Sequence, residues 1–289
     1  MVAPTLSDFT FQYTDTGVVL GQDTAIQPFV DITTVQGLDN ATYRVSAKDT
    51  EGIDGGVVEA DFESMRIIVI EGNIYGGTSM ESYLDSLKGN YAPVLTSQPF
   101  YFKAPGVAQR LVFCKSITGL RYDWDLSRRN NITPFQIQLQ AGDPTIYASA
   151  LQTTIATLPP AATVGRGYNR LYPLTYGGAT SSGLINVTNS GNKPAPAVFS
   201  ITGPVTNPQI ISDTAGASIQ IQISLVTGDT LTIDLGKRTV ILNGTANRRN
   251  LWAPGSKWFL LQPGVNQLRF DASTQTASQL TITWRDAYR

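Results

Sequence analysis

Alternating apolar and polar positions recur along the chain and predict a protein built mainly from β-strands. Phe135, Ile137 and Leu139 are separated by glutamines, the period-two pattern of a strand with one buried and one wet face. Residues 122–126 alternate in the same way, and the β-branched run at 66–70 is typical of a strand buried on both faces. We therefore expect a sheet in the first half of the chain.

One short helix interrupts these strands. Thr78, followed three residues later by Glu81, has the spacing of a capping box with Thr78 as the N-cap. The residues at helical spacing on one face are Met80, Leu84 and Leu87. The Gly-Asn pair at 89–90 then supplies the left-handed backbone that ends a helix. The pattern predicts an amphipathic helix packed on a sheet.

The second half of the chain alternates more regularly. Segments 219–225 and 231–235 carry an apolar residue at every second position and flank a turn signal at 227–229, which predicts a hairpin. The Asn-Gly pair at 243–244 and the Pro-Gly pair at 263–264 predict two further turns. Two more strands carry the apolar residues Leu268, Phe270, Leu280, Ile282 and Trp284. Many short strands at near-regular spacing indicate an antiparallel β-sandwich.

The strand pattern fades between residues 141 and 183, where proline and small residues dominate as in a connector. A chain of 289 residues suggests two domains. We place a first domain at 1–150, a connector at 151–168 and a second domain at 169–289. The predicted fold class is all-β with one short helix.

Charge is sparse. Charged residues make up 15% of the chain, the net charge is −1, and no basic run is longer than a pair such as Arg128-Arg129 or Arg248-Arg249. We therefore expect no sequence-specific binding of nucleic acid. The apolar runs are too short to span a bilayer and the N-terminus lacks an export pattern, so we expect no membrane partner. A polar but weakly charged surface suits permanent contacts with other proteins.

The chain has no histidine and one cysteine, Cys114. His-based triads and nearly all zinc sites are therefore excluded, and no internal disulfide can form. Cys114 lies in an apolar run, where we expect a small buried side chain. We predict that the protein is not an enzyme and has no catalytic residues, no cofactor-binding residues and no metal site.

Two acidic groups offer alternatives to that prediction. Asp123 and Asp125 would project from one strand face about 7 Å apart, a separation that suits an inverting glycosidase. A solvated strand face neutralised by Arg121, Arg128 or Arg129 is the favoured interpretation. The acids at 49–54 resemble a calcium loop, but Ile53 stands where an oxygen ligand is required, which favours an acidic turn.

Six acids precede the next cation, Arg66: Asp49, Glu51, Asp54, Glu59, Asp61 and Glu63. In isolation such a cluster is a solvated loop. The sequence alone thus favours a solubilising acidic loop.

The order and spacing of these motifs resemble those of the distal tail protein (Dit) of long-tailed, non-contractile phages. The segments that carry the resemblance are 51–56, 66–74, 78–88, 111–113, 139–140, 205–208, 228–234 and 258–266. The resemblance implies a tail-tube-like β-sandwich with one helix, followed by a galectin-like β-sandwich. It also implies a homo-oligomer, a hexameric ring, with the tail tube protein on one face and hub or fibre proteins on the other. Such a ring belongs to the virion at the phage tail tip, is assembled in the host cytoplasm and lets DNA pass through its centre.

The resemblance gives the six acids a second interpretation. In a ring around DNA they would form a negative wall that repels phosphate, because a positive wall would bind it. Both interpretations of the acids stay open at this point.

No catalytic residues define that family, and the sugar-binding histidine of galectins does not exist in this chain. A free-standing carbohydrate-binding adhesin stays open as the alternative, because Trp252, Trp258, Tyr172 and Tyr176 could stack on sugars. The same aromatics could instead be core plugs or interface anchors. A ring subunit predicts stable oligomers, and an adhesin predicts a monomer with sugar affinity. An enzyme, the third possibility, predicts an activity that is lost when the paired carboxylates are replaced.

Overall fold

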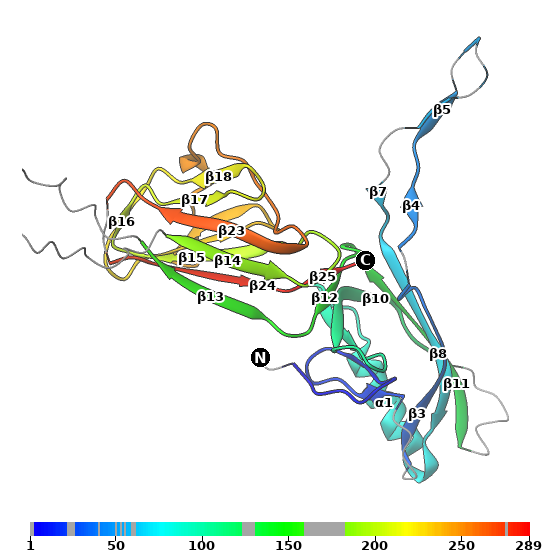
Figure 1. Ribbon diagram of the computed structural model, residues 1–289. Coiled ribbons are helices and arrows are strands. Elements are labelled where there is room, and N and C mark those ends of the chain that lie inside the picture. Colours follow the sequence, from blue (N-terminus) through cyan, green and yellow to red (C-terminus); the bar gives the residue numbers. More distant parts are fainter. Residues whose placement is uncertain are drawn as a thin grey trace, which may run out of the picture. The chain divides into compact units, whose positions relative to one another are not determined.

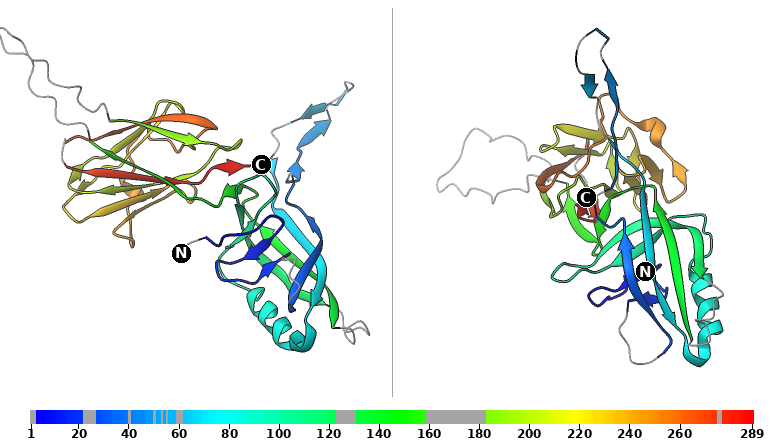
Figure 2. Two further views of the ribbon diagram at one scale, coloured as in Figure 1. Left: turned by 60° about the horizontal axis from the view of Figure 1, so that its bottom comes forward. Right: turned by 90° about the vertical axis from the view of Figure 1, so that its right-hand side faces the viewer.

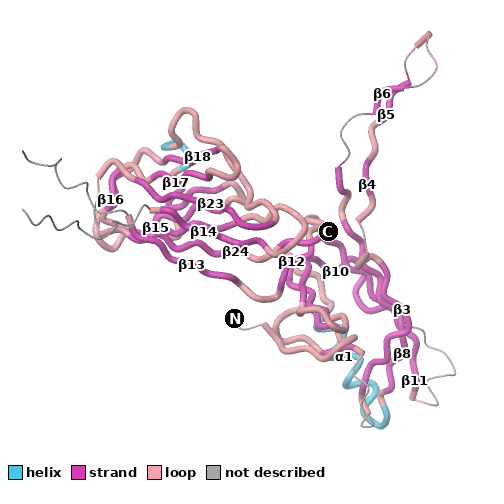
Figure 3. The backbone as a smooth tube through the Cα atoms, in the orientation of Figure 1, coloured by secondary structure: helices cyan, strands magenta, loops and turns pink. Residues whose placement is uncertain are grey.

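The structure is a computed structural model of the whole chain and divides into two compact units. It describes residues 3–21, 27–39, 41–49, 51–52, 54, 56–58, 62–122, 131–158, 183–274 and 277–289. The first unit is Met1–Ala150 with Tyr288–Arg289, and the second is Leu151–Ala287. Strands dominate both units, and the described residues contain one α-helix (Figures 1 and 3).

The first unit is a curled antiparallel sheet in the order β2-β1-β9-β10-β11-β8-β3. Its strands are β1 (Phe11–Tyr13), β2 (Val19–Leu20), β3 (Phe29–Gln36), β8 (Arg66–Tyr75), β9 (Gln98–Phe102), β10 (Arg110–Tyr122) and β11 (Ile132–Ala141). The short strands β12 (Ile146–Ala148) and β25 (Ala287–Tyr288) extend it beside β10. The amide of Gly21, next to β2, donates to the carbonyl oxygen of Val30 on β3 at 2.9 Å, so the two end strands meet at a seam.

The core of this unit lies inside the curl and is closed by the helix α1 (Met80–Asn90), which presents Met80, Leu84 and Leu87 as predicted. The predicted cap is wrong. The 3-10 turn η1 (Gly77–Ser79) contains Thr78, and the N-cap is Ser79, which makes no side-chain capping bond. The helix also runs through Asn90 and stops at Tyr91, which is fully buried and stacks on Tyr13 with ring centroids 5.3 Å apart. Packing therefore decides where this helix ends, over the local signals.

Strand β8 differs from its prediction as well. Its side chains alternate between buried and partly exposed, and Ile67 is 52% exposed. One face of β8 therefore packs on the core while the other is open, so burial on both faces is wrong. On β11 the expected alternation is confirmed, with Phe135, Ile137 and Leu139 buried. Of the predicted strand at 122–126, Tyr122 is the last residue of β10, and residues 123–126 lie outside the described residues.

An arm leaves the sheet between β3 and β8 and continues their pairing outward (Figures 1 and 2). We define the arm as the described residues of 41–65. It pairs β4 (Tyr43–Arg44) with β7 (Phe62–Glu63), and β5 (Ala47–Asp49) with β6 (Gly56–Val58). None of the described helices is long and apolar enough to cross a membrane.

The root of the arm is held by Arg66, which is only 3% exposed. Its Nε donates to the carbonyl oxygen of Pro144 at 3.0 Å, and its Nη1 donates to the carbonyl oxygens of Gly37, at 2.7 Å, and of Asp39. Burial lowers the pKa of Arg66, and the carboxylate of Asp39 counteracts this. The guanidinium thus ties the end of β3, the start of β8 and the β11–β12 turn together.

The second unit is an antiparallel sandwich of a six-stranded sheet, β13-β24-β15-β20-β21-β22, and a four-stranded sheet, β14-β23-β17-β18. The first sheet is made of β13 (Gln152–Thr157), β15 (Ala197–Thr202), β20 (Thr230–Asp234), β21 (Thr239–Leu242), β22 (Ala246–Asn247) and β24 (Gln279–Trp284). The second is made of β14 (Leu184–Asn189), β17 (Gln209–Ser212), β18 (Ala217–Gln220) and β23 (Gly264–Asp271). A separate ladder joins β16 (Val205–Thr206) to β19 (Ser224–Leu225), and a 3-10 turn, η3, spans Arg249–Leu251. Every second residue of the main strands is buried in a common core.

The predicted hairpin of 219–225 with 231–235 is wrong in its pairing. Strand β18 pairs with β17, β19 pairs with β16, and β20 lies between β15 and β21. The predicted burial of Ile219, Ile221, Leu231 and Ile233 is nonetheless confirmed. Alternation determines which face of a strand is buried, whereas the partner strand depends on contacts that are distant in sequence.

The turn between β21 and β22 is confirmed at its Asn-Gly pair. Asn243 has φ 52° and Gly244 has φ 74°, the left-handed pair at the centre of a type I′ turn, and the amide of Thr245 donates to the carbonyl oxygen of Leu242 at 3.2 Å. Gly264 has φ 92°, as expected at the second central position of a type II turn.

The segment 151–168, predicted to be a connector, begins with a strand. Strand β13 occupies Gln152–Thr157 and pairs along its whole length with β24 in the sandwich. Residues 159–182 lie outside the described residues. At the other end, Tyr288 returns to the first unit, where its ring lies 3.9 Å from the guanidinium carbon of Arg110.

Candidate interaction surfaces

The acidic groups do not form a site in the part of the chain that the structure describes. Asp123 and Asp125 lie outside the described residues. Asp49 ends β5, and Glu51 and Asp54 follow it in the exposed turn toward β6. Among the described residues, no three His, Cys, Asp or Glu side chains gather closely enough to hold a metal ion.

Cys114 is fully buried, as the sequence predicted. Burial raises the pKa of its thiol to about 12. The thiol therefore stays protonated at neutral pH, and an unexposed, protonated thiol is a poor nucleophile.

The arm exposes large apolar side chains that contact little of their own chain. Their exposed fractions lie between 50% and 66%, and they are Tyr43, Val45, Val58, Phe62 and Met65. We call these five residues the arm surface. The register pairs Tyr43 with Glu63 and Arg44 with Phe62, so Tyr43 and Phe62 lie on opposite faces of the arm. Single exposed apolar residues are ordinary, but several on one projecting hairpin make it a candidate for binding.

A second surface follows β10 on the outer face of the sheet. Exposed side chains recur at every second or fourth position of this strand. We call them the β10 strip, which consists of Phe113, Lys115, Ile117 and Arg121. Ile117 is 49% exposed. The ring of Phe113 packs beside that of Tyr147, with the ring centroids 6.0 Å apart. The strip therefore alternates apolar and cationic side chains.

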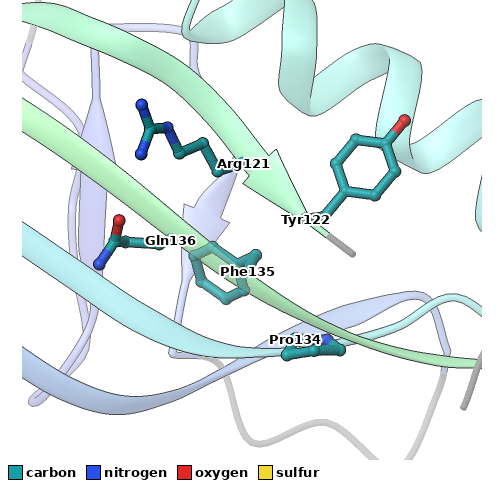
Figure 4. Close-up of a pocket in the computed structure, with 5 residues that line it drawn as sticks. All are labelled: Arg121, Tyr122, Pro134, Phe135 and Gln136. Carbon is teal, nitrogen blue, oxygen red and sulfur yellow. The ribbon is translucent and has the colours of Figure 1, made fainter. Parts of the chain in front are cut away.

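An open depression of about 300 Å³ lies at the far end of the β10 strip (Figure 4). Its lining comes from two paired strands: Arg121 and Tyr122 on β10, and Pro134, Phe135 and Gln136 on β11. Lys88 of α1 lies over the Tyr122 ring at 5.3 Å. Among the described lining residues, Arg121 alone carries a charge.

Polar side chains cover the neighbouring strand on the same outer face. The amide of Gln138 donates to the side-chain oxygen of Gln136 at 3.3 Å, and Gln136 donates to Glu71 on β8 at 2.7 Å. These bonds hold a flat ladder of amides next to the β10 strip.

The second unit carries a pair of stacked tryptophans. Trp252 and Trp258 have centroids 4.3 Å apart, and Arg249 lies over Trp258 at 5.6 Å. The indole nitrogen of Trp252 donates to the carbonyl oxygen of Ser256 at 3.2 Å. Both rings are thus held by their own chain. Tyr172 and Tyr176, the other aromatics considered for stacking on sugars, lie outside the described residues.

Comparisons with known proteins match part of the chain to a protein family and its fold to solved structures. Residues 190–288 match the family model described as siphovirus-type tail component, C-terminal domain. The crystal structure of the Dit (gp 19.1) protein of phage SPP1 is similar over 96% of this chain and 98% of that chain, with a TM-score of 0.64 and 14% sequence identity. The chain therefore has a fold similar to that of a siphovirus Dit (distal tail protein), and its residues 190–288 match the siphovirus-type tail component family.

A chain of the phage P2 baseplate in its activated conformation with Ca is also similar to this chain. The similarity covers 95% of this chain and 97% of that chain, with a TM-score of 0.50 and 10% identity. At these identities the likeness to solved structures establishes the fold. Curated protein sequences give no match.

Sequence reasoning missed both the arm surface and the β10 strip. On the arm a signal was present, because Tyr43, Val45 and Ala47 alternate with polar residues. On β10 the signal was masked, because Phe113 stands between the apolar residues Val112 and Cys114. Alternation alone does not tell whether the apolar face meets a core of its own chain or another protein.

Proposed function

We propose that the chain is the structural subunit of a phage tail-tip (baseplate) ring, which joins the tail tube to the host-recognition hub and lets DNA pass through its centre. The observation that carries the proposal is the whole-chain likeness to the SPP1 Dit fold, together with the family match over residues 190–288. SPP1 Dit itself is described as a paradigm of the hub adsorption apparatus in phages that infect Gram-positive hosts.

The chemistry of the surfaces supports this role. The arm surface and the β10 strip expose apolar side chains on the first unit. Contacts with other subunits would cover such side chains and remove them from water. The low charge of the chain reduces the cost of removing water from such contacts. We further propose that the protein catalyses no reaction, in keeping with a structural family.

Two measurements test the proposal: whether the chain is present in purified phage tails, and the mass of the assembly that the purified chain forms. The chain should be present in tails purified from virions of its phage, and antibodies against it should label the tail tip. Native mass spectrometry of the chain, alone and with the tube or hub protein, should give a species near six subunits. Absence of the chain from purified tails would refute the proposal.

The adhesin alternative makes a different prediction. Trp252 and Trp258 would have to offer a ring face to a sugar, yet they stack on each other and Arg249 lies over Trp258. A monomer that binds a glycan with measurable affinity, and loses it on Trp258→Ala, would favour the adhesin.

A further inference from the structure

We infer that the second unit binds an acidic protein segment at a cluster of arginines, and that this segment is the arm of another copy of the chain. We call Arg238, Arg248 and Arg249 the arginine cluster. This inference rests on the proposed ring function and names a contact between neighbouring subunits.

The charged side chains of the chain are segregated by sign. Residues 151–287 contain ten lysines and arginines against five aspartates, a net charge of +5, and the rest of the chain has eleven cations against seventeen acids, a net charge of −6. The positive charge is concentrated at residues 235–258, with five cations and no acid, and the negative charge at residues 49–65, with six acids and no cation. An acidic segment of one copy is therefore attracted to the second unit of another.

Two neighbouring turns of the six-stranded sheet bring the arginine cluster together. Arg238 ends the turn between β20 and β21, and Arg248 and Arg249 follow β22. The amide of Arg248 donates to the carbonyl oxygen of Val240 at 2.8 Å and so continues the pairing of β21 with β22. Nη1 of Arg249 donates to the carbonyl oxygen of Arg238 at 2.8 Å, and both of these residues are exposed.

Arg249 is held ready for a carboxylate. Its guanidinium lies over the ring of Trp258, 5.6 Å from the centroid, while Nη1 is tied to Arg238. A guanidinium has more N–H donors than this one bond uses, so it can still donate to both oxygens of a carboxylate. Because the side chain is already restricted, it loses little further conformational entropy on binding. Asp234, the one acid of residues 230–258, lies 3.7 Å from Nζ of Lys237 and accepts a bond from the Lys237 amide at 2.9 Å.

The arm is the acidic segment that fits this cluster. Residues 41–65 carry a net charge of −4, with Asp49, Glu51 and Asp54 exposed near the end of the arm, which projects from its sheet (Figures 1 and 2). Arginine and tryptophan together are typical of the central contacts of protein interfaces. Every copy brings one arm and one arginine cluster, and two different surfaces that bind each other give a heterologous contact. Such a contact produces a closed ring when the rotation per subunit completes a circle.

Cross-linking tests the contact directly, because the buried Cys114 leaves the background silent. A Val58→Cys chain and an Asn250→Cys chain are mixed and treated with a short bismaleimide. Val58 is exposed near the end of the arm, and Asn250 is exposed next to the arginine cluster. We expect a cross-linked dimer of the two chains and none from either chain alone. The matched control replaces Asn250→Cys by Val226→Cys, which is 66% exposed in the same unit but lies before β20, and should give no dimer.

Solution assembly tests the energetics. The cluster variant, Arg238→Glu with Arg249→Glu, places like charges against the arm and should raise the concentration of half-assembly about tenfold or more, as measured by sedimentation at about 0.15 M salt. The control variant, Lys193→Glu with Lys257→Glu, makes the same change of net charge in the second unit. The amides of these lysines bond to Ala287 and Ser218, away from the cluster. Its half-assembly concentration should stay within about twofold of the wild type, because salt screens a charge that lies outside the contact.

A charge swap tests the choice of partner. The arm variant carries Asp49→Lys and Glu51→Lys and should assemble more weakly than wild type when it is alone. An equimolar mixture of the arm variant and the cluster variant should recover, because alternating copies restore opposite charges at every contact. A contact between the arm and the cluster of the same chain would not recover in the mixture, and that result overturns the inference.

The outcomes separate this inference from the proposed function. If wild-type rings form, alone or with the tube or hub protein, but the Val58–Asn250 cross-link is absent and the cluster variant assembles like wild type, the inference is overturned while the ring stands. If the cluster variant loses binding only to a tube or hub protein or to an anionic glycan, the cluster serves that partner and the inference is again overturned. A chain missing from purified tails refutes the proposed function, whatever the cluster binds.

Discussion

Replacing Arg66 by methionine tests how the root of the arm is held. Methionine keeps an unbranched apolar stem but removes the donor to the carbonyls of Gly37, Asp39 and Pro144. A buried acceptor left without a donor costs about 1–3 kcal/mol. The variant no longer has to bury a charge, and this offsets part of the cost of the three unpaired carbonyls. We therefore expect the free energy of unfolding to fall by about 3 kcal/mol, the lower end of the range for breaking a buried charged interaction.

For a unit of this size, such a loss lowers the melting temperature by about 6–12 °C. Urea unfolding of the full chain measures the free energy, and hydrogen exchange at the amides of β8 assigns the change to the first unit. Arg44→Met is the matched control, because it removes the same charge from an exposed position on the arm. If the two variants unfold alike, the three hydrogen bonds of Arg66 contribute nothing and the anchoring argument fails.

Three further variants or conditions test other parts of the molecule. Ile221→Asp should destabilise the second unit by about 3–5 kcal/mol, because it places an unpaired carboxylate in the core, whereas Ile155→Asp, at an exposed position, should change melting little. Burial raises the pKa of the Cys114 thiol to about 12 from its ordinary value near 9, so the thiol ionises more easily in the unfolded chain. The buried thiol therefore contributes its full stabilisation below pH 9, and this stabilisation is lost as the pH rises toward 12. A Cys114→Ala chain should lack this loss when unfolding is followed at alkaline pH. Gly244→Val should lower the free energy of unfolding by about 1–3 kcal/mol, because φ at this position is positive. Gly142→Val is the control: φ is not positive there and no atom lies within 4 Å of the added Cβ, so the same melting assay should show a smaller loss.

The sequence predicted which residues face inward better than it predicted which strands are neighbours. Ile219, Ile221, Leu231 and Ile233 are all buried, because period-two alternation records the face on which a strand packs. Their strands nevertheless pair elsewhere, since β20 meets β15 rather than β18. Pairing depends on the shape of the whole sandwich, and no local pattern contains that information.

Local signals failed where tertiary packing overrode them. Thr78 and Glu81 have a capping-box spacing, but the chain enters α1 through a 3-10 turn and Ser79 takes the cap position. Ile67 and Val69 fit the pattern of a doubly buried strand, but one face of β8 is open. The candidate surfaces were hidden for the same reason, because an apolar residue such as Phe62 has the same pattern in a core and in an interface.

The seam between Gly21 and Val30 affects how the edge of this sheet can pair with another copy of the chain. A sheet with free end strands offers unpaired amides and carbonyls on which other copies can add without limit. Here the amide of Gly21, next to the two-residue strand β2, donates to the carbonyl oxygen of Val30 near the start of β3. A strand of another copy that paired with Val30 at this edge would first have to break that bond.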